Sequence, residues 1–217
     1  MSSRVLLELW MTKTLPLFTL AIGVLISACA PETETAGTET QSAETAATET
    51  TATEDAGTET AEAVEPITAA EVEAAQQAWG EGIVAIGQVH TEGGDVEAAA
   101  RDHIEQFYAY GERPVLFKPT LASDDQFRGT FDEALSYFVG GSIEEDGGFA
   151  LAPYTNVRWE NEGVFLDENS AMAMGNYFFT TTEGDAVKVE YSFGYERGED
   201  GDLKIVLHHS SLPYSAQ

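Results

Sequence analysis

Between Pro31 and Glu65 the sequence is a repetitive tract of threonine, glutamate and alanine, and it contains no aromatic and no basic residue. The tract carries 10 acidic residues. Such a composition buries too little apolar surface to offset the conformational entropy that folding costs. We therefore expect residues 30–65 to be a disordered, self-repelling tether, and residues 66–217 to be the segment that builds a core.

The segment that precedes this tract has the features of a lipoprotein signal peptide. Lys13 comes before the apolar run "LPLFTLAIGVLISA", which is shorter than the ~20 residues that a membrane-spanning helix needs. The run leads directly to Cys29, the only cysteine of the chain. This ending resembles the bacterial lipobox, in which the cysteine is lipidated. An incidental buried thiol is the alternative for Cys29, and translation can start at Met1 or at Met11.

From this pattern we predict that residues 1–29 are a signal peptide and that the chain is exported. A lipid anchor at Cys29 would then attach it to a bacterial membrane, on the periplasmic or the outer surface. With a single cysteine, the chain can form no internal disulfide and no zinc site built on cysteine pairs.

The domain that follows the tether is strongly acidic. Residues 66–217 contain 27 acidic and 8 basic residues, and the whole chain has a formal net charge of -28. Negative charge of this size argues against nucleic acid as a partner. Solubility outside the cytoplasm explains it equally simply.

Helical patterns fill the first half of this domain. Thr68 and Glu71 have the spacing of a capping box, which predicts that a helix begins there and continues to about His90. A second helical pattern runs from Asp95 to Gly111, and the segment "TFDEALSYFVGG" predicts a third helix. Between the last two, "RPVLFKPT" reads as a short strand or an extended segment.

The second half has the period-two character of strands. Turn signals rich in glycine and aspartate separate four such segments: "ALAPYTNVRWENEGVFLDEN", "SAMAMGNYFFTTTEGD", "AVKVEYSFGYERGEDGD" and "LKIVLHHSSLP". Helices followed by an antiparallel meander predict an α+β domain. In it, the helices pack on a curved sheet and enclose a small pocket.

The last strand ends in polar residues that belong in such a pocket. Read with strict alternation, one face of this strand is the more apolar one. Its members are Leu203, Ile205, Leu207, His209 and Ser211. We therefore predict that His209 and Ser211 point into the pocket and that His208 and Ser210 do not.

Six segments in order carry a resemblance to a known family. They are "FKPTLA", "FDEALSYFVGG", "GGFALAPY", "AMGNYFF", "VEYSFGY" and "IVLHHSSLPY". Together, over roughly residues 66–214, they resemble the iota-class carbonic anhydrases that act without a metal, within the NTF2-like (SnoaL-like) superfamily. The resemblance implies a cone-shaped α+β barrel, reversible hydration of CO2 to bicarbonate, no metal cofactor and a homodimer.

The same resemblance implies a pocket of one threonine, one tyrosine, one histidine and one serine. These fall on Thr120, Tyr137, His209 and Ser211. For the tyrosine, three other residues are able to reach a cavity: Tyr177, Tyr191 and Tyr195. Without zinc, water keeps a pKa of about 15.7, so a base must remove its proton during attack. We hypothesise that His209 is this base or orients the water, while the hydroxyls stabilise the developing negative charge.

Several alternatives stay open at this level. Thr120 could cap the next helix, Tyr137 could be ordinary packing, and a histidine on an apolar face is often a hydrogen-bonded core residue. Other branches of the iota class are metal-dependent, although this chain has only four histidines. A SnoaL-like isomerase or dehydratase would use a buried carboxylate, and a non-catalytic ligand-binding or association lipoprotein would need no base.

Overall fold

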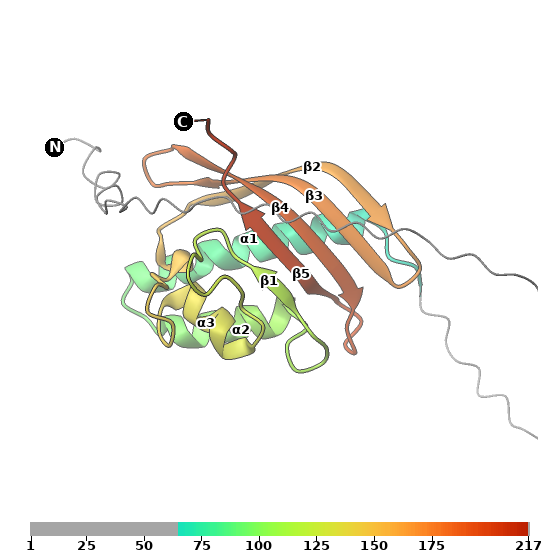
Figure 1. Cartoon of the computed structure of the whole chain (residues 1–217), viewed down its shortest axis with the longest axis horizontal. Coiled ribbons are helices and arrows are strands. Elements are labelled where there is room, and N and C mark those ends of the chain that lie inside the picture. The colour runs from blue at the N-terminus through green and yellow to red at the C-terminus, as the bar shows by residue number, and fades with distance from the viewer. Residues whose placement is uncertain (1–64, 217) are drawn as a thin grey trace, which may run out of the picture. The chain divides into compact units, whose positions relative to one another are not determined.

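The computed structural model describes residues 65–216 (Figure 1). The predicted signal peptide, the predicted lipidation at Cys29 and the predicted tether up to residue 64 lie outside the described residues. Within residues 65–216, no helix is both long enough and apolar enough to cross a membrane.

Helix α1 (Ala69–Thr91) begins at the predicted capping box. The Glu71 N–H donates to the Thr68 hydroxyl oxygen at 3.2 Å, and the Thr68 N–H donates to the Glu71 carboxylate at 2.8 Å. These two bonds satisfy backbone donors that a helix start leaves without an intrahelical acceptor. The sequence thus locates the start of the longest helix correctly.

Helix α2 (Val96–Phe107) starts after Asp95 as predicted but stops before Gly111. The reason is tertiary, because Tyr108 takes an extended conformation and forms an isolated bridge with Ile205. Helix α3 (Phe131–Val139) ends at Gly140, whose φ of 81° favours glycine.

The five strands are β1 (Leu116–Lys118), β2 (Asn156–Leu166), β3 (Ser170–Thr180), β4 (Ala186–Arg197) and β5 (Leu203–Ser211). Their order in the sheet is β1-β5-β4-β3-β2. Strands β2 to β5 form the predicted antiparallel meander, and the predicted α+β class is confirmed. Two details differ from the expectation. Strand β1 pairs parallel to β5, and within residues 65–216 β1 and β2 are free edges, so the sheet is not closed into a barrel.

The helices cover one face of this sheet, and the core lies between the two layers (Figure 1). Trp79 of α1 is 1% exposed and lies at the centre of this core. Its ring makes edge-on contacts, with centroids 5.7 to 6.0 Å apart, to Trp159, Tyr177, Phe193 and His208. Aromatic pairs of this kind contribute about 0.5–1.5 kcal/mol beyond the area they bury. The inner face is therefore a dense aromatic layer.

A β-bulge interrupts the pairing of the last two strands. Gly194 of β4 pairs with Leu207, whereas the next residue, Tyr195, pairs with Ile205. Val206 is therefore an extra residue on β5. One extra residue reverses the face to which every later side chain of that strand points.

The bulge overturns the predicted orientation of the polar ending of β5. His208 and Ser210 are each 3% exposed and face the core. His209 is exposed, and Ser211 is partly exposed with its hydroxyl bonded to Glu190 at 3.0 Å. The prediction that His209 and Ser211 point inward is therefore wrong, because strict alternation does not continue through Val206.

Candidate functional site

A cavity of about 90 Å³ lies at the end of the core where β5 finishes. Its lining residues come from the loop after β1, from α3, from the segment before β2 and from strands β3 to β5. They are Thr120, Leu121, Tyr137, Phe149, Tyr154, Tyr177, Phe179, Val187, Val189, His208, Ser210 and Leu212.

A larger hollow of about 680 Å³ lies between α1 and the edge strand β2. Its lining contains Glu73 and Glu81 but none of the four residues that the sequence predicted for the site. Size alone would favour this groove. We place the candidate site in the smaller cavity, because oriented hydroxyls and an imidazole converge there on an otherwise apolar wall.

Three hydroxyls meet at one end of the cavity. Residues Lys118 and His209 pair where β1 runs beside β5, and this pairing brings the segment after β1 next to Ser210. The Thr120 hydroxyl donates to the Ser210 hydroxyl oxygen at 2.9 Å. Burial raises the pKa of the neighbouring Tyr177 above its ordinary value, although the nearby hydroxyls of Ser210 and Thr120 act to lower it. The three groups therefore stay neutral and form one connected cluster.

Tyr137 supplies a fourth hydroxyl from α3. Its side chain is 7% exposed, its ring stacks on Phe149 at a centroid distance of 5.1 Å, and its oxygen accepts from the Leu121 N–H at 3.4 Å. Burial raises the pKa of Tyr137, so its phenol keeps its proton near neutral pH. It can donate that proton to a small ligand in the cavity.

His208 is held between aromatic rings. It stacks on Phe117 with centroids 4.5 Å apart and lies 4.1 Å from the Phe193 centroid. Its Nδ1 is 2.8 Å from the Tyr108 hydroxyl. Its Nε2 is buried and has no hydrogen-bond partner within residues 65–216. Burial, followed by the charges of two other histidines, holds the pKa of His208 well below its ordinary value, so the imidazole is neutral at pH 7.

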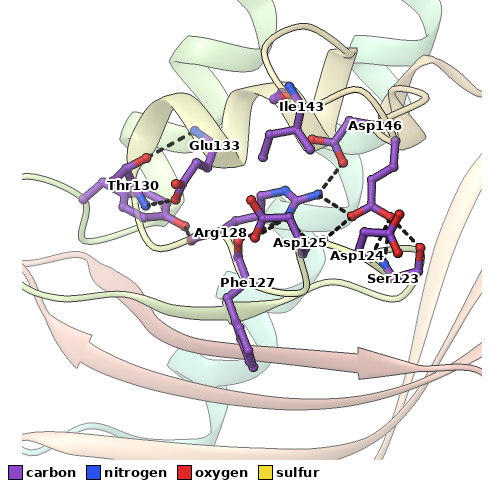
Figure 2. Close-up of polar contacts among 12 residues, drawn as sticks. Ser123, Asp124, Asp125, Phe127, Arg128, Thr130, Glu133, Ile143 and Asp146 are labelled. Atoms are coloured by element: carbon purple, nitrogen blue, oxygen red, sulfur yellow. Dashed lines mark hydrogen bonds and ion pairs between the residues drawn. The ribbon is translucent and has the colours of Figure 1, made fainter.

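A buried ion pair fixes the loop that carries Thr120 (Figure 2). Arg128 is fully buried, and its guanidinium donates to Asp146 at 2.6 Å and to the Asp125 carbonyl at 2.5 Å. The same guanidinium lies 5.9 Å from the centroid of the Tyr137 ring. One cation thus contacts both the loop after β1 and the tyrosine of α3.

A carboxylate fastens the outer part of this loop. Glu145 accepts hydrogen bonds from the hydroxyl and N–H of Ser123 and from the N–H groups of Asp124 and Asp125, at 2.6 to 3.1 Å. These bonds, led by that of the Ser123 hydroxyl, lower the pKa of Glu145 to about 2. The loop therefore has two anchors on the segment between α3 and β2.

Comparison with known proteins identifies the family. A family model described as metal-independent carbonic anhydrase matches residues 70–212. A metal-independent carbonic anhydrase from Nostoc sp. (strain PCC 7120) is 44% identical over 153 residues, which are 68% of this chain and 75% of that protein. This chain belongs to the metal-independent carbonic anhydrase family.

A solved structure of this family agrees with the assignment. The crystal structure of the iota-carbonic anhydrase from a cyanobacterium, complexed with bicarbonate, is 42% identical and gives a TM-score of 0.67. The match covers 70% of this chain and 95% of that one. The similarity therefore includes nearly the whole of the solved domain.

The donor set in the cavity is consistent with a carbonic anhydrase that needs no metal. Among residues 65–216, one imidazole lines the cavity, and no aspartate, glutamate or cysteine does. Throughout residues 65–216, no three such side chains are placed so as to hold a metal ion. The enzyme belongs to a family whose members act without a metal cofactor.

The structure brings together two of the four predicted site residues. Thr120 and Tyr137 line the cavity, whereas His209 and Ser211 lie on the other side of the sheet, and His208 and Ser210 occupy the positions predicted for them. The sequence does contain a signal for this shift. Gly194 lies between two buried aromatic residues of β4, Phe193 and Tyr195, and an isolated glycine in a strand indicates a bulge or a close approach of the backbone. A Cβ at Gly194 would lie 3.0 Å from the Leu207 Cβ.

Proposed function

We propose that this carbonic anhydrase reversibly hydrates CO2 to bicarbonate in the cavity lined by His208, Ser210, Thr120, Tyr137 and Tyr177. One observation supports this assignment above the others. His208 Nε2 is buried and has no hydrogen-bond partner among residues 65–216. A buried polar atom left in this state costs about 1–3 kcal/mol, so it calls for a partner that the protein does not supply. An oxygen of the substrate or product fits this role.

The ligand chemistry suits the rest of the cavity. CO2 is neutral and apolar, and the wall beside the hydroxyl cluster is made of Phe149, Phe179 and Val189. Negative charge develops on the oxygens of CO2 as water attacks its carbon. Hydroxyls and a ring nitrogen directed at these oxygens stabilise the transition state more than the neutral substrate, which is the condition for catalysis. Bicarbonate bound to the cyanobacterial relative supports the same ligand class.

The proton of the attacking water has a route through hydroxyls. No carboxylate from the described part of the chain, residues 65–216, lines the cavity, and the tyrosines there have raised pKa values. Ser210 can accept a proton on its oxygen while it passes on its own, because a hydroxyl is both acceptor and donor. In the reverse direction the same cluster protonates the oxygen that leaves as water. An isomerase or dehydratase that relies on a buried carboxylate has no such group in this lining.

Matched substitutions test the assignment. His208→Leu should lower kcat for CO2 hydration by about 10²-fold, the typical loss when one oxyanion donor is removed. His209→Leu, on the adjacent outward position, should leave kcat near the wild-type value. Both are measured by stopped flow on chelator-treated protein with its metal content determined. Equal loss in the two variants, or activity that requires added metal, contradicts the proposal.

We also propose that the enzyme is an exported lipoprotein, anchored at Cys29, and that it forms a homodimer. The apolar run before Cys29 and the acidic tract after it support the first part. Large apolar side chains on the outer face of β2 and β3 support the second, since Phe165, Met172 and Met174 are 53 to 60% exposed and lie side by side. Labelling with a radioactive fatty acid and sedimentation of the protein test these two points separately.

A further inference from the structure

We propose that Trp79 and Tyr108 fix His208 as the neutral tautomer that carries its proton on Nε2. In this form His208 donates a hydrogen bond to an oxygen of the substrate and does not act as the base. This inference rests on the proposed function of the cavity, and it assigns Tyr108 as a positioning residue that acts through His208.

The three side chains form a buried chain of hydrogen bonds. The Trp79 indole N–H donates to the Tyr108 hydroxyl oxygen at 3.1 Å. That oxygen lies 2.8 Å from Nδ1 of His208. Trp79, Tyr108 and His208 are 1%, 2% and 3% exposed, so bulk water cannot substitute for a missing partner.

The direction of this chain follows from the capacity of each group. An indole nitrogen can only donate, and a phenol has one proton to give. If the Tyr108 proton goes to Nδ1, then the indole, the phenol and Nδ1 are all paired, and Nε2–H is the one donor left for a ligand to satisfy. If Nδ1 instead carries the proton, it must donate to the Tyr108 oxygen, and the Tyr108 proton has no acceptor among the contacts of residues 65–216. The second arrangement leaves two buried groups without a partner among residues 65–216, the Tyr108 O–H and the Nε2 lone pair, against one in the first, so the first is favoured by roughly tenfold or more.

The third state, a charged imidazolium, is excluded by its surroundings. The ring packs against Phe117, Phe193 and Trp79. No carboxylate is hydrogen-bonded or ion-paired to it within residues 65–216, and a buried charge without a partner is strongly disfavoured. His208 is therefore neutral, and its proton resides on Nε2.

This tautomer decides what His208 does in the reaction. As the water oxygen bonds to carbon, one C=O π-bond breaks and its electron pair moves to an oxygen that accepts the hydrogen bond from Nε2–H. The proton of the water goes to the Ser210 oxygen, and the proton of Ser210 passes to another oxygen of the former CO2. The product is carbonic acid, which ionises to bicarbonate and a proton. No buried group is required to hold a net charge.

The tautomer can be measured without any activity assay. In the chain labelled with ¹⁵N-histidine, two-bond ¹H–¹⁵N correlation spectra distinguish a protonated from an unprotonated ring nitrogen. Among the signals of the four histidines, those of His208 are identified by their loss in His208→Leu. We expect protonated Nε2 and unprotonated Nδ1 at pH 7. Protonated Nδ1, or a charged ring, overturns the inference even if the cavity is the active site.

Tyr108→Phe tests the positioning role, with Tyr110→Phe as the matched control. Tyr110 stacks on Tyr108, but its hydroxyl donates to the Arg128 carbonyl and not to His208. We expect Tyr108→Phe to give a mixture of tautomers and to lower kcat about tenfold with KM little changed. Tyr110→Phe should keep the wild-type histidine spectrum. A wild-type spectrum or a wild-type kcat in Tyr108→Phe contradicts the inference. If Tyr108→Phe changes the tautomer as expected but His208→Leu keeps full activity, the proposed function is contradicted instead.

Discussion

Replacing Ser210 by alanine separates a catalytic role of this strand from a structural one. Ser210 is 3% exposed, and its oxygen accepts the hydrogen bond from Thr120. The substitution removes one donor to the developing negative charge and also the group that passes the proton of the water. Loss of a single oxyanion donor costs about 10² to 10³ in kcat, or about 2.7–4 kcal/mol of transition-state stabilisation. We therefore expect kcat to fall by at least about 10²-fold.

The effect on stability should be much smaller. Removing the Ser210 hydroxyl breaks its hydrogen bond with Thr120, whose hydroxyl stays near the phenol of Tyr177. We expect the free energy of unfolding to fall by about 0.5–1.5 kcal/mol, the net value of one intramolecular hydrogen bond. A domain of ordinary stability, about 5–15 kcal/mol, stays folded after such a loss.

The assay is stopped-flow CO2 hydration with a pH indicator, together with urea unfolding of the same preparations. Ser211→Ala is the matched control, because Ser211 is the next residue and bonds to Glu190 on the outer face. It should keep wild-type kcat and change the unfolding free energy by less than about 0.5 kcal/mol. Wild-type kcat in Ser210→Ala, or an equal loss of activity in Ser211→Ala, contradicts a catalytic role of Ser210.

Two further predictions concern buried ionisable groups. Burial lowers the pKa of His103 to about 3 and that of His208 well below about 6.5. The unfolded chain then binds protons that the folded chain does not. The contribution of each histidine to the free energy of unfolding is therefore fully present above about pH 6.5 and is lost as the pH falls, by up to about 1.4 kcal/mol per pH unit. Urea unfolding between about pH 7 and pH 5 measures this slope, and an unchanged slope in His103→Leu contradicts it. Arg128→Ala leaves the carboxylate of Asp146, which is 1% exposed, buried without its cation. This substitution should lower the free energy of unfolding, measured in urea, by about 3–5 kcal/mol. A loss below about 1 kcal/mol contradicts a stabilising role of the ion pair.

Local signals in the sequence predict most of the fold. The capping box at Thr68 sets the start of α1, and the glycine-rich and aspartate-rich turns mark the ends of the long strands. These signals depend on neighbours in the chain, which explains why they can be read without coordinates. The end of α2 and the pairing of β1 depend on contacts with β5, more than 80 residues further along the chain. No local pattern encodes them.

In the candidate site too, local sequence predicts some residues, whereas others depend on contacts between distant segments. Thr120 and Tyr137 could be placed from their motifs, because each lies in a segment whose course is set locally. Tyr108 and Trp79 could not, since neither lines the cavity and their connection to His208 exists only through a chain of buried hydrogen bonds. Residues that act through another residue leave no signature in the pattern of one strand.

The segment "HHSS" explains why the sequence gives the right residue types for β5 and the wrong positions. The hydrophobic pattern normally fixes the register of a strand, because a shift of one residue exposes its apolar set. A shift within two histidines followed by two serines presents the same types on the inner face. Alternation therefore cannot distinguish His208 and Ser210 from His209 and Ser211. What decides between them is the extra residue Val206, which lies opposite Gly194 and Tyr195 where the pairing shifts, and a Cβ at Gly194 would lie 3.0 Å from the Leu207 Cβ. A side chain at position 194 should therefore collide with Leu207 and shift the pairing of β5 with β4 next to the cavity.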